Sequence, residues 1–252
     1  MKLGVSGASG QMGALTATTL AAEEGMHLIA LYDAHTSGSI AGIPISTDRT
    51  ALEPCDTIVE FSRPDVVLDN LATWRSFGAN VVVGTSGFDA ERIEQVREMW
   101  GRGPGNCLIV PNFSIGAVLM MKISEMVAPH YPVAEIIELH HDRKADAPSG
   151  TAVATAERIA AAHPDQQRQV DSEESVPGAT GADVDGVRVH SVRLPGLVAH
   201  QRVVFGGGGD VLSISHDTIE RRSFMPGVLL AIRSIRDQPE PLAVGLEPLL
   251  GL

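Results

Sequence analysis

Short apolar runs alternate with segments of helical spacing through the first part of the chain. Between two of these runs, Asp65–Phe77 places Val66, Leu71 and Trp74 at intervals that put them on one side of a helix. Strands that alternate with helices form parallel sheets covered on both faces, so this pattern predicts a doubly wound Rossmann-type α/β sheet. The predicted strands are Lys2–Ser6, His27–Tyr32, Thr57–Phe61, Asn80–Gly84 and Leu108–Val110.

The pattern changes after about residue 112, which predicts a second domain of the α+β class. Its expected elements are two helices, a long polar loop at His163–Asp185, and a roughly four-stranded mixed sheet. The helices are Ile115–Met126 and Gly150–Ala162, and the strands are Ala134–Leu139, Val187–Leu194, Leu197–Phe205 and Val211–His216. Pro226 then suits the first turn of a last helix, which we expect to return to the first domain. The predicted division is residues 1–112 with 225–252, and residues 113–224.

Composition and charge narrow the class of protein. The 252 residues carry 19 Lys and Arg against 31 Asp and Glu, a net charge of −12. This acidity argues against nucleic-acid binding and against a polybasic membrane anchor. No apolar run reaches the ~18 residues of a membrane span, and Met1–Gly7 has no apolar signal core. We therefore expect a cytoplasmic globular enzyme or binding protein.

A glycine-rich loop follows the first predicted strand and opens the first helix. Gly7-Ala8-Ser9-Gly10-Gln11-Met12-Gly13 has the spacing GxxGxxG, which allows a tight turn and a close approach to a pyrophosphate. Asp33 ends the next strand, 20 residues after Gly13, where a carboxylate binds ribose hydroxyls. The competing interpretation is a plain strand-to-helix turn and a surface Asp. Ala34 and His35 supply no Lys or Arg for a 2′-phosphate, which favours NADH, but a charge from elsewhere could admit NADPH.

Two further loops leave the ends of later strands. They are Gly84-Thr85-Ser86-Gly87-Phe88 and Pro111-Asn112-Phe113-Ser114. Ligands of open α/β sheets bind at this edge, so the loops could hold the amide and ribose of a nicotinamide. Turn chemistry alone is the alternative.

The stretch Glu138–Ala152 contains more candidate catalytic and binding residues than any other part of the chain. His140, His141, Arg143 and Lys144 form a basic cluster at the end of a predicted strand. Ser149-Gly150-Thr151 then begins a helix, whose first N–H groups attract anions. These groups suit a substrate with carboxylates, and Lys144 can donate a proton. Adjacent His residues without a partner three or four positions away lack a usual zinc spacing, so we predict no metal site; an exposed polar loop remains the alternative.

These motifs together resemble the 4-hydroxy-tetrahydrodipicolinate reductase (dihydrodipicolinate reductase) family, especially its actinobacterial members. The specific part is Glu138-Leu139-His140-His141, then Lys144, then Asp146-Ala147-Pro148-Ser149-Gly150-Thr151-Ala152. The glycine loop, the two later loops and the segment His216…Arg221…Phe224 match in the same order, so the resemblance covers the full length.

The resemblance implies NAD(P)H-dependent reduction of 4-hydroxy-tetrahydrodipicolinate in the diaminopimelate and lysine pathway. It implies a first domain that binds NADH, NADPH or both, and a second domain that binds a cyclic dicarboxylate and forms a homotetramer. The implied catalytic residues are His140 and Lys144, either of which could deliver the proton, and the substrate-binding residues are His141, Gly150 and Thr151. The implied cofactor-binding residues are Gly7, Ala8, Ser9, Gly10, Gln11, Met12, Asp33, Gly84, Thr85, Ser86, Pro111, Asn112, Phe113, Arg221 and Phe224.

Two other functions compete with this one. An aldehyde dehydrogenase of similar plan would need an activated thiol, but neither Cys55 nor Cys107 has a neighbouring His or helix start. A non-catalytic dinucleotide-sensing regulator would bind the cofactor without consuming it. The His140–Thr151 stretch argues against such a regulator.

Overall fold

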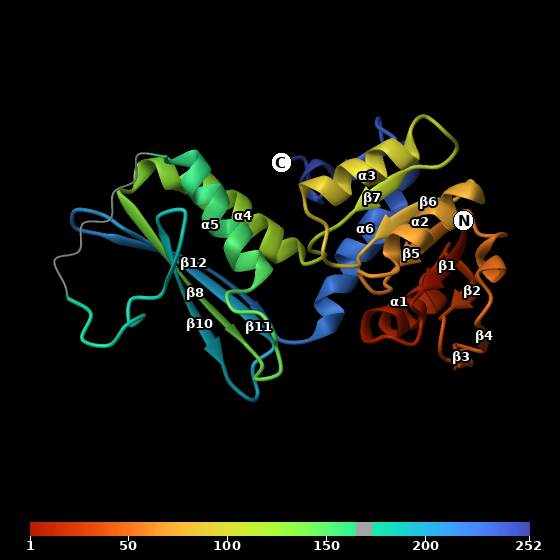
Figure 1. Ribbon diagram of the computed structural model, residues 1–252, viewed down its shortest axis with the longest axis horizontal. Helices are drawn as coiled ribbons and strands as arrows, with labels where there is room; N and C mark the ends of the chain where they lie inside the picture. Colours follow the sequence, from red (N-terminus) through yellow and green to blue (C-terminus); the bar gives the residue numbers. More distant parts are fainter. Residues whose placement is uncertain (165–172) are drawn as a thin grey trace. The chain divides into compact units, whose positions relative to one another are not determined.

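The computed structural model describes residues 1–164 and 173–252 (Figure 1). The chain forms compact units, one of Met1–Ser114 with Phe224–Leu252 and one of Ile115–Ser223.

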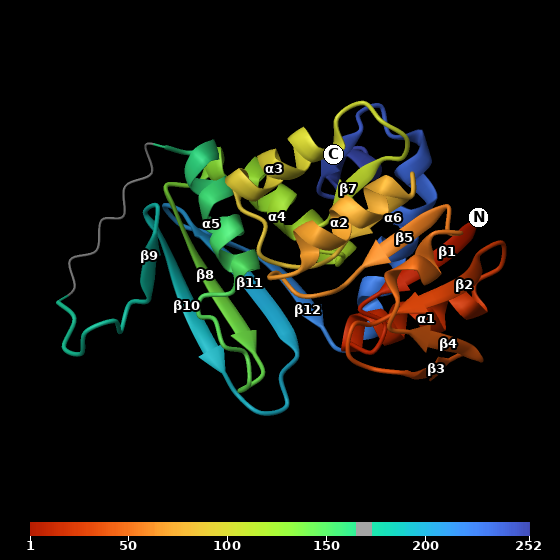
Figure 2. The ribbon, with the colours of Figure 1, turned by 45° about the vertical axis from the view of Figure 1, so that its right-hand side comes forward.

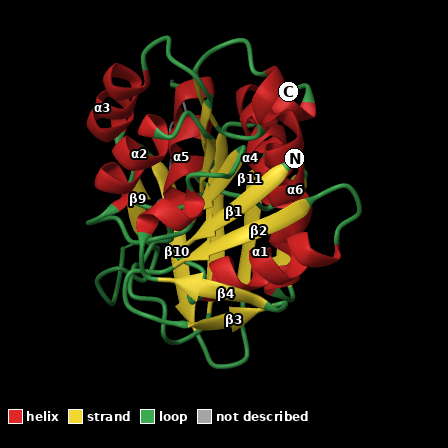
Figure 3. Ribbon diagram, turned by 90° about the vertical axis from the view of Figure 1, so that its right-hand side faces the viewer, coloured by secondary structure: helices red, strands yellow, loops and turns green. Residues whose placement is uncertain are grey.

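The first unit is built on a largely parallel sheet. Within the described residues it has eight strands in the order β13-β7-β6-β5-β1-β2-β4-β3, and Figure 3 shows its β1-β2-β4-β3 side. The bounds are β1 Lys2–Ser6, β2 His27–Tyr32, β3 Gly38–Ile40, β4 Ile43–Ser46, β5 Thr57–Glu60, β6 Asn80–Val83, β7 Cys107–Ile109 and β13 Leu242–Val244. Only β3 runs antiparallel to its neighbour. The Rossmann-type prediction is confirmed, with β3, β4 and β13 added at the edges.

Helices follow the central strands as the periodicity predicts. They are α1 Gln11–Ala22, α2 Val67–Ser76, α3 Ala90–Trp100 and α6 Met225–Ser234, with 3₁₀ turns η1 Arg49–Leu52, η4 Ile235–Asp237 and η5 Glu247–Leu250. Asp89 caps α3 by accepting a hydrogen bond from the Arg92 N–H at 2.9 Å, and Pro226 lies in the first turn of α6. The C-terminal segment adds β13 beside β7.

A buried carboxylate lies within the core of this unit. Glu60 at the end of β5 is fully buried, and its Oε2 accepts hydrogen bonds from Trp74 Nε1 at 2.7 Å and Asn70 Nδ2 at 3.3 Å. The backbone N–H of Ser62 donates to Oε1 at 2.7 Å. These donors replace the water that the carboxylate loses on folding.

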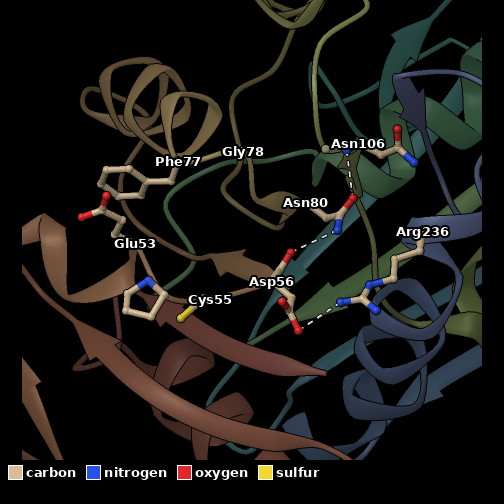
Figure 4. A pocket seen from close by; sticks show the side chains of 10 residues that line it. Glu53, Cys55, Asp56, Phe77, Gly78, Asn80, Asn106 and Arg236 are labelled. Carbon is tan, nitrogen blue, oxygen red and sulfur yellow. Dashed lines mark hydrogen bonds and ion pairs between the residues drawn. The ribbon is translucent and has the colours of Figure 1, made fainter.

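The amino edge of the sheet has a hollow of about 560 Å³ with polar walls. Figure 4 shows Asp56 between Asn80 and Arg236: its carbonyl accepts from Asn80 Nδ2 at 3.0 Å, and its carboxylate pairs with Arg236 at 3.1 Å. The Asn106 N–H donates to Asn80 Oδ1 at 3.0 Å. These contacts join the C-terminal segment to the edge of the sheet. Because the polar groups of the hollow already bind one another, few of them are left to bind a ligand.

The second unit is a mixed sheet with helices on one face (Figures 1 and 2). Its described strands have the order β12-β11-β8-β10-β9, with β8 and β10 parallel and β11 antiparallel to β8. The strands are β8 Val133–His140, β9 Ala182–Val184, β10 Val187–Arg193, β11 Ala199–Gly206 and β12 Val211–Thr218; the helices are α4 Ile115–Val127 and α5 Gly150–Ala162, with η2 Ala128–His130 and η3 Arg221–Phe224.

The expected long loop at His163–Asp185 is correct only in part. Its end forms β9, which pairs with β10 and gives the described sheet five strands instead of the roughly four predicted. Three residues are too few for a visible alternation of apolar and polar positions. Residues 165–172 of the expected loop lie outside the described part. Throughout residues 1–164 and 173–252, the helices are too short or too polar to cross a bilayer.

Glu60 makes the core sensitive to the loss of one donor. Trp74→Phe removes the Nε1–H and leaves a buried carboxylate oxygen poorly paired, which should cost about 1–3 kcal/mol in the free energy of unfolding beyond the lost packing. Trp100→Phe is the matched control, since Trp100 is equally buried but its Nε1 donates to the neutral Gly105 carbonyl at 3.0 Å. Urea unfolding of both variants should show the larger loss for Trp74→Phe; equal losses contradict the account.

Candidate active site

The glycine loop between β1 and α1 has the conformation that its sequence predicts. Gly7 has φ +72°, a left-handed value that favours glycine. A Cβ on Gly13 would lie 2.0 Å from the Gly7 carbonyl oxygen, so the first turn of α1 packs directly on the loop. The loop therefore leads from the carboxyl end of β1 directly into the first turn of α1.

The N-terminus of α1 has the features of an anion site. Its N-cap is Gly10, which supplies no capping side chain, and its first turn has no acidic residue. A cavity of about 330 Å³ lies beside it, lined by Gly7, Ser9, Gly10 and Asp33 among others. Backbone N–H groups and the helix dipole favour negative charge at such a position, so the residues fit the pyrophosphate of a dinucleotide.

Asp33 lies at the end of β2 and lines the same cavity. Its carboxylate accepts hydrogen bonds from the Ser9 hydroxyl, from the Ser9 N–H at 3.2 Å and from the His35 N–H at 3.1 Å. Burial works to raise the pKa of Asp33, but these hydrogen bonds outweigh it and hold the pKa below the usual value. The group is therefore a charged acceptor, as a ribose-binding carboxylate must be.

Three predicted cofactor-binding residues of the phosphate loop do not line this cavity: Ala8, Gln11 and Met12. Ala8 is fully buried, with its N–H bonded to the Tyr32 carbonyl at 3.1 Å. Gln11 and Met12 begin α1 and are not among the residues that line the cavity. They can contribute to a cofactor site only through their position at the start of the helix.

The two later loops meet around a pair of aromatic rings. Phe113 follows β7 and packs on Phe61, with ring centroids 5.6 Å apart. A Cβ on Gly84 would lie within 2.6 Å of both rings, so only glycine fits after β6. The Thr85 hydroxyl donates to the Ser62 carbonyl at 3.2 Å, and Ser86 and Pro111 are exposed.

Asn112 accepts a hydrogen bond from the Ser114 N–H at 2.8 Å, which fixes the second of these loops. Both loops follow strands of the first sheet at its carboxyl edge, as the sequence predicts, although they are not among the residues that line the cavity beside α1.

The second unit holds a buried network centred on Glu138, which we call the Glu138 network. Glu138 is fully buried at the end of β8, and its carboxylate accepts two hydrogen bonds from Arg193 at 3.0 and 2.8 Å. It also accepts from the Ser149 N–H at 3.3 Å and contacts His140 Nδ1. Burial acts to raise the pKa of Glu138, but the bonds from Arg193, Ser191 and His140 hold it below the usual value.

The surroundings of His140 lower its pKa and so favour the neutral ring. Burial lowers its pKa most, the positive charges of Lys144 and Arg193 lower it further, and the carboxylate of Glu138 only partly compensates. Because a charged carboxylate faces Nδ1, the neutral ring carries its proton on Nδ1 and leaves Nε2 as an acceptor.

Lys144 is held beside this network. Its ammonium bonds both oxygens of Asp146 at 2.7 and 2.8 Å, and its backbone N–H donates to the His141 carbonyl at 3.2 Å. The side chain is 23% exposed, so it is held in one place but accessible. The geometry suits a proton donor.

The predicted substrate-binding residues surround the start of α5. Ser149 caps this helix by accepting from the Ala152 N–H at 3.2 Å, while a Cβ at Gly150 would meet open space. Thr151 is half-buried in the first turn. His141 has a buried Nδ1 without a hydrogen-bond partner in the described part of the chain, which is energetically unfavourable.

Two predicted cofactor residues lie where the chain passes from one unit to the other. Arg221 belongs to η3 and is exposed, and Phe224 is half-buried. Their place in the site stays a prediction.

The sequence predicted neither Glu138 nor Arg193, which are 55 residues apart, as a site residue, although Glu138 belongs to the signature run and Arg193 lies on a predicted strand. The register of β8 and β10 pairs His140 with Arg193 and Glu138 with Ser191, and so brings these groups together. A signal existed in the sequence, since a carboxylate two positions before His140 points to the same side of a strand.

Comparison with known proteins adds a full-length match. Residues 1–113 match the family model "Dihydrodipicolinate reductase, N-terminus", and residues 116–250 match "Dihydrodipicolinate reductase, C-terminus". The chain is 48% identical to a 4-hydroxy-tetrahydrodipicolinate reductase from Mycobacterium marinum and 48% identical to one from Thermobifida fusca, each over the whole of both chains.

A solved structure is also similar. It is a dipicolinate-bound dihydrodipicolinate reductase from Paenisporosarcina sp. TG-14, 35% identical, with a TM-score of 0.87 and 98% of each chain covered.

The thiols should be inert in the folded protein. Burial raises the pKa of Cys55 to about 12 and raises that of Cys107 as well, so neither forms a thiolate near neutral pH. A chromogenic disulfide reagent at pH 7.5 should therefore react with neither thiol until denaturant is added. Rapid reaction of the native protein with loss of activity would instead support the thiol-dependent alternative.

Proposed function

The chain belongs to the dihydrodipicolinate reductase family, and from this membership we propose how its residues divide the work of the reaction. It reduces 4-hydroxy-tetrahydrodipicolinate to tetrahydrodipicolinate with NAD(P)H, a step of diaminopimelate and lysine biosynthesis. The observation that carries this conclusion is the match of both family models across nearly the whole chain.

The first unit is the cofactor-binding part in this proposal. Gly7–Met12 and the start of α1 receive the pyrophosphate, and Asp33 binds the hydroxyls of the adenosine ribose. Gly84–Ser86 and Pro111–Phe113 contact the nicotinamide half. Arg221, at the end of the second unit, and Phe224 make further contacts with the cofactor. The bound cofactor supplies the hydride. The N-terminus of α1, which has no capping side chain, and the lowered pKa of Asp33 support this assignment.

The second unit binds a small cyclic dicarboxylate. The related Paenisporosarcina enzyme binds dipicolinate, and we extend that class of ligand to this chain. The start of α5 at Gly150 and Thr151 holds one carboxylate, because first-turn N–H groups attract anions. His141, which directly follows β8, is the substrate-binding histidine in this proposal. These contacts orient the ring so that the carbon to be reduced faces the nicotinamide.

Lys144 delivers the proton that balances the hydride. The 4-hydroxy group leaves as water before or during the reduction. Hydride adds to a ring carbon of the unsaturated imine, and the electron pair displaced through the conjugated system takes up a proton. The neutral His140 has an acceptor at Nε2, so it does not provide that proton; the ammonium of Lys144, held by Asp146, can. His140 Nε2 instead accepts a hydrogen bond from a ligand group or from the hydroxyl that leaves.

We also propose a homotetramer in the cytoplasm. The second sheet has helices on one face only, and strand alternation places Ile137, Leu139, Val192 and Val204 on the other face, all partly exposed. β12 is an edge strand, with Val211 67% exposed. An uncovered sheet face with an open edge supports association with further copies of the chain.

A coupled assay tests the activity directly. A synthase forms the unstable substrate in place from pyruvate and aspartate semialdehyde, and the loss of reduced-nicotinamide absorbance is followed with NADH and with NADPH. Substrate-dependent oxidation is expected. Cofactor binding without oxidation would favour the dinucleotide-sensing regulator.

Removing the proton donor should slow the chemical step. Lys144→Ala should lower kcat by roughly 10²–10⁴-fold, the usual contribution of a positioned acid, while the Kd for NADH stays unchanged. Lys122→Ala is the matched control, because Lys122 of the same unit pairs with Glu125 on α4. Turnover near the wild-type value in Lys144→Ala would contradict the assignment.

Neutralising the centre of the Glu138 network should change the pH profile as well as the rate. In Glu138→Gln the ring of His140 loses the charge that fixes its tautomer and raises its pKa. We expect kcat to fall roughly 10–100-fold and the acidic limb of the kcat profile to move to lower pH.

Glu135→Gln on the same strand is the control for Glu138→Gln, since Glu135 pairs with His190 away from the site. An unshifted acidic limb in a folded Glu138→Gln protein would show that Glu138 is only structural.

A further inference from the structure

Two arginines from outside the glycine motif line the cavity beside the glycine loop. Arg49 begins η1, after β4, and Arg63 lies after β5. Both share the cavity with Asp33, Ala34 and His35, where the sequence offers no Lys or Arg directly after the ribose-binding carboxylate.

The two guanidinium groups differ in how they are paired. Arg63 donates two hydrogen bonds to Asp65, at 3.0 and 2.9 Å, and its side chain is 73% exposed. Arg49 is half-buried, donates from Nε to the Tyr32 hydroxyl at 3.3 Å, and makes no ion pair within residues 1–164 and 173–252. The charge of Arg63 is thus already balanced by a carboxylate, whereas that of Arg49 is not.

The position of Arg49 is fixed on both sides. Its turn is closed by Asp48, whose carboxylate accepts from the Thr50 N–H at 2.9 Å, and by Ser46, whose hydroxyl bonds to Asp48. Tyr32 is almost fully buried and packs edge-on against Trp74. A guanidinium whose Nε is already held keeps its two terminal NH₂ groups for one further acceptor.

Arg49 and the proposed ribose-binding carboxylate of Asp33 line the same cavity. The Asp33 N–H donates to the Ser46 carbonyl at 3.0 Å, which ties the end of β2 to the chain that leads into η1. Asp33 and Arg49 are sixteen positions apart in the sequence, and this backbone hydrogen bond helps to bring both to the lining of one cavity. Paired terminal NH₂ groups match the oxygens of a phosphate monoester, which is the group that distinguishes NADPH from NADH.

We infer that Arg49 binds the 2′-phosphate of NADPH and lets the chain use this cofactor as well as NADH. The inference rests on the proposed function, which places the adenosine ribose at Asp33. Asp33 serves the free 2′-hydroxyl of NADH, and the charge of Arg49 offsets the repulsion that Asp33 and Asp65 exert on a phosphate. His35 presents only its exposed side chain and a backbone N–H that is bonded to Asp33.

Two small probes isolate this end of the cofactor. Adenosine 2′,5′-bisphosphate carries the 2′-phosphate and 5′-AMP lacks it, and neither contains the nicotinamide. Titration calorimetry gives Kd for both with the wild-type protein, Arg49→Leu, Arg49→Lys and Arg63→Gln. The readout is the ratio of the two dissociation constants in each protein, measured alongside Kd for NADH and NADPH.

Arg49→Leu should weaken binding of the bisphosphate and of NADPH about tenfold relative to 5′-AMP and NADH, the size expected for a charge-assisted contact. Arg49→Lys should recover part of the preference, because an ammonium keeps the charge without the paired NH₂ groups. Arg63→Gln should change the ratio less than about twofold, since Asp65 already neutralises Arg63.

The outcomes separate this inference from the proposed function. An unchanged ratio in Arg49→Leu overturns the assignment, and equal weakening of all four ligands also overturns it, by showing a contact with adenine instead. If the wild-type protein bound neither 5′-AMP nor NADH, the cavity would not be an adenosine site, and the cofactor role proposed for Asp33 would be wrong.

Discussion

The buried ion pair between Glu138 and Arg193 is the constraint on which the arrangement of the second unit depends. A carboxylate without solvent is stable only when donors surround it, and here they come from β10, from the ring of His140 and from the first backbone group before α5. One charge therefore fixes the end of two strands, the tautomer of a histidine and the start of a helix. The chemistry proposed for this unit uses all three.

In the first unit, the proposed cofactor site depends on positive groups, whereas the Glu138 network is centred on a buried negative charge. At α1 the chain leaves a helix N-terminus without a capping side chain, and at η1 it leaves a guanidinium without an ion pair in the described residues. Both are local positive sites in a chain of net charge −12. A protein that repels most anions over its surface can still select an anionic cofactor and a dicarboxylate through a few fixed donors.

Much of this arrangement could be predicted from the sequence. The order of strand, glycine loop, helix and Asp33 is local, and so the central strands of the first sheet agree with their predictions. The strands β3, β4, β9 and β13 could not be predicted, because they lie at or next to the sheet edges and are mostly exposed or half-buried. They lack the buried apolar runs that mark the equally short strands β5, β6 and β7. The sequence predicted a candidate site where its residues are contiguous, at His140–Thr151, and did not predict the contacts that strand pairing makes between distant residues. Arg193 reaches Glu138 only through the β8–β10 register, and Arg49 reaches the cavity only through a 3₁₀ turn.

The protonation state of His140 is the most direct test of the account. Nitrogen NMR of the ¹⁵N-labelled protein distinguishes the two neutral tautomers and the charged ring, and a pH series gives the pKa. We predict a neutral ring at pH 7, protonated on Nδ1, with a pKa below the ordinary 6.5. A ring protonated on Nε2, or still charged at pH 7, would contradict the role of Glu138 and return the proton-donor role to His140.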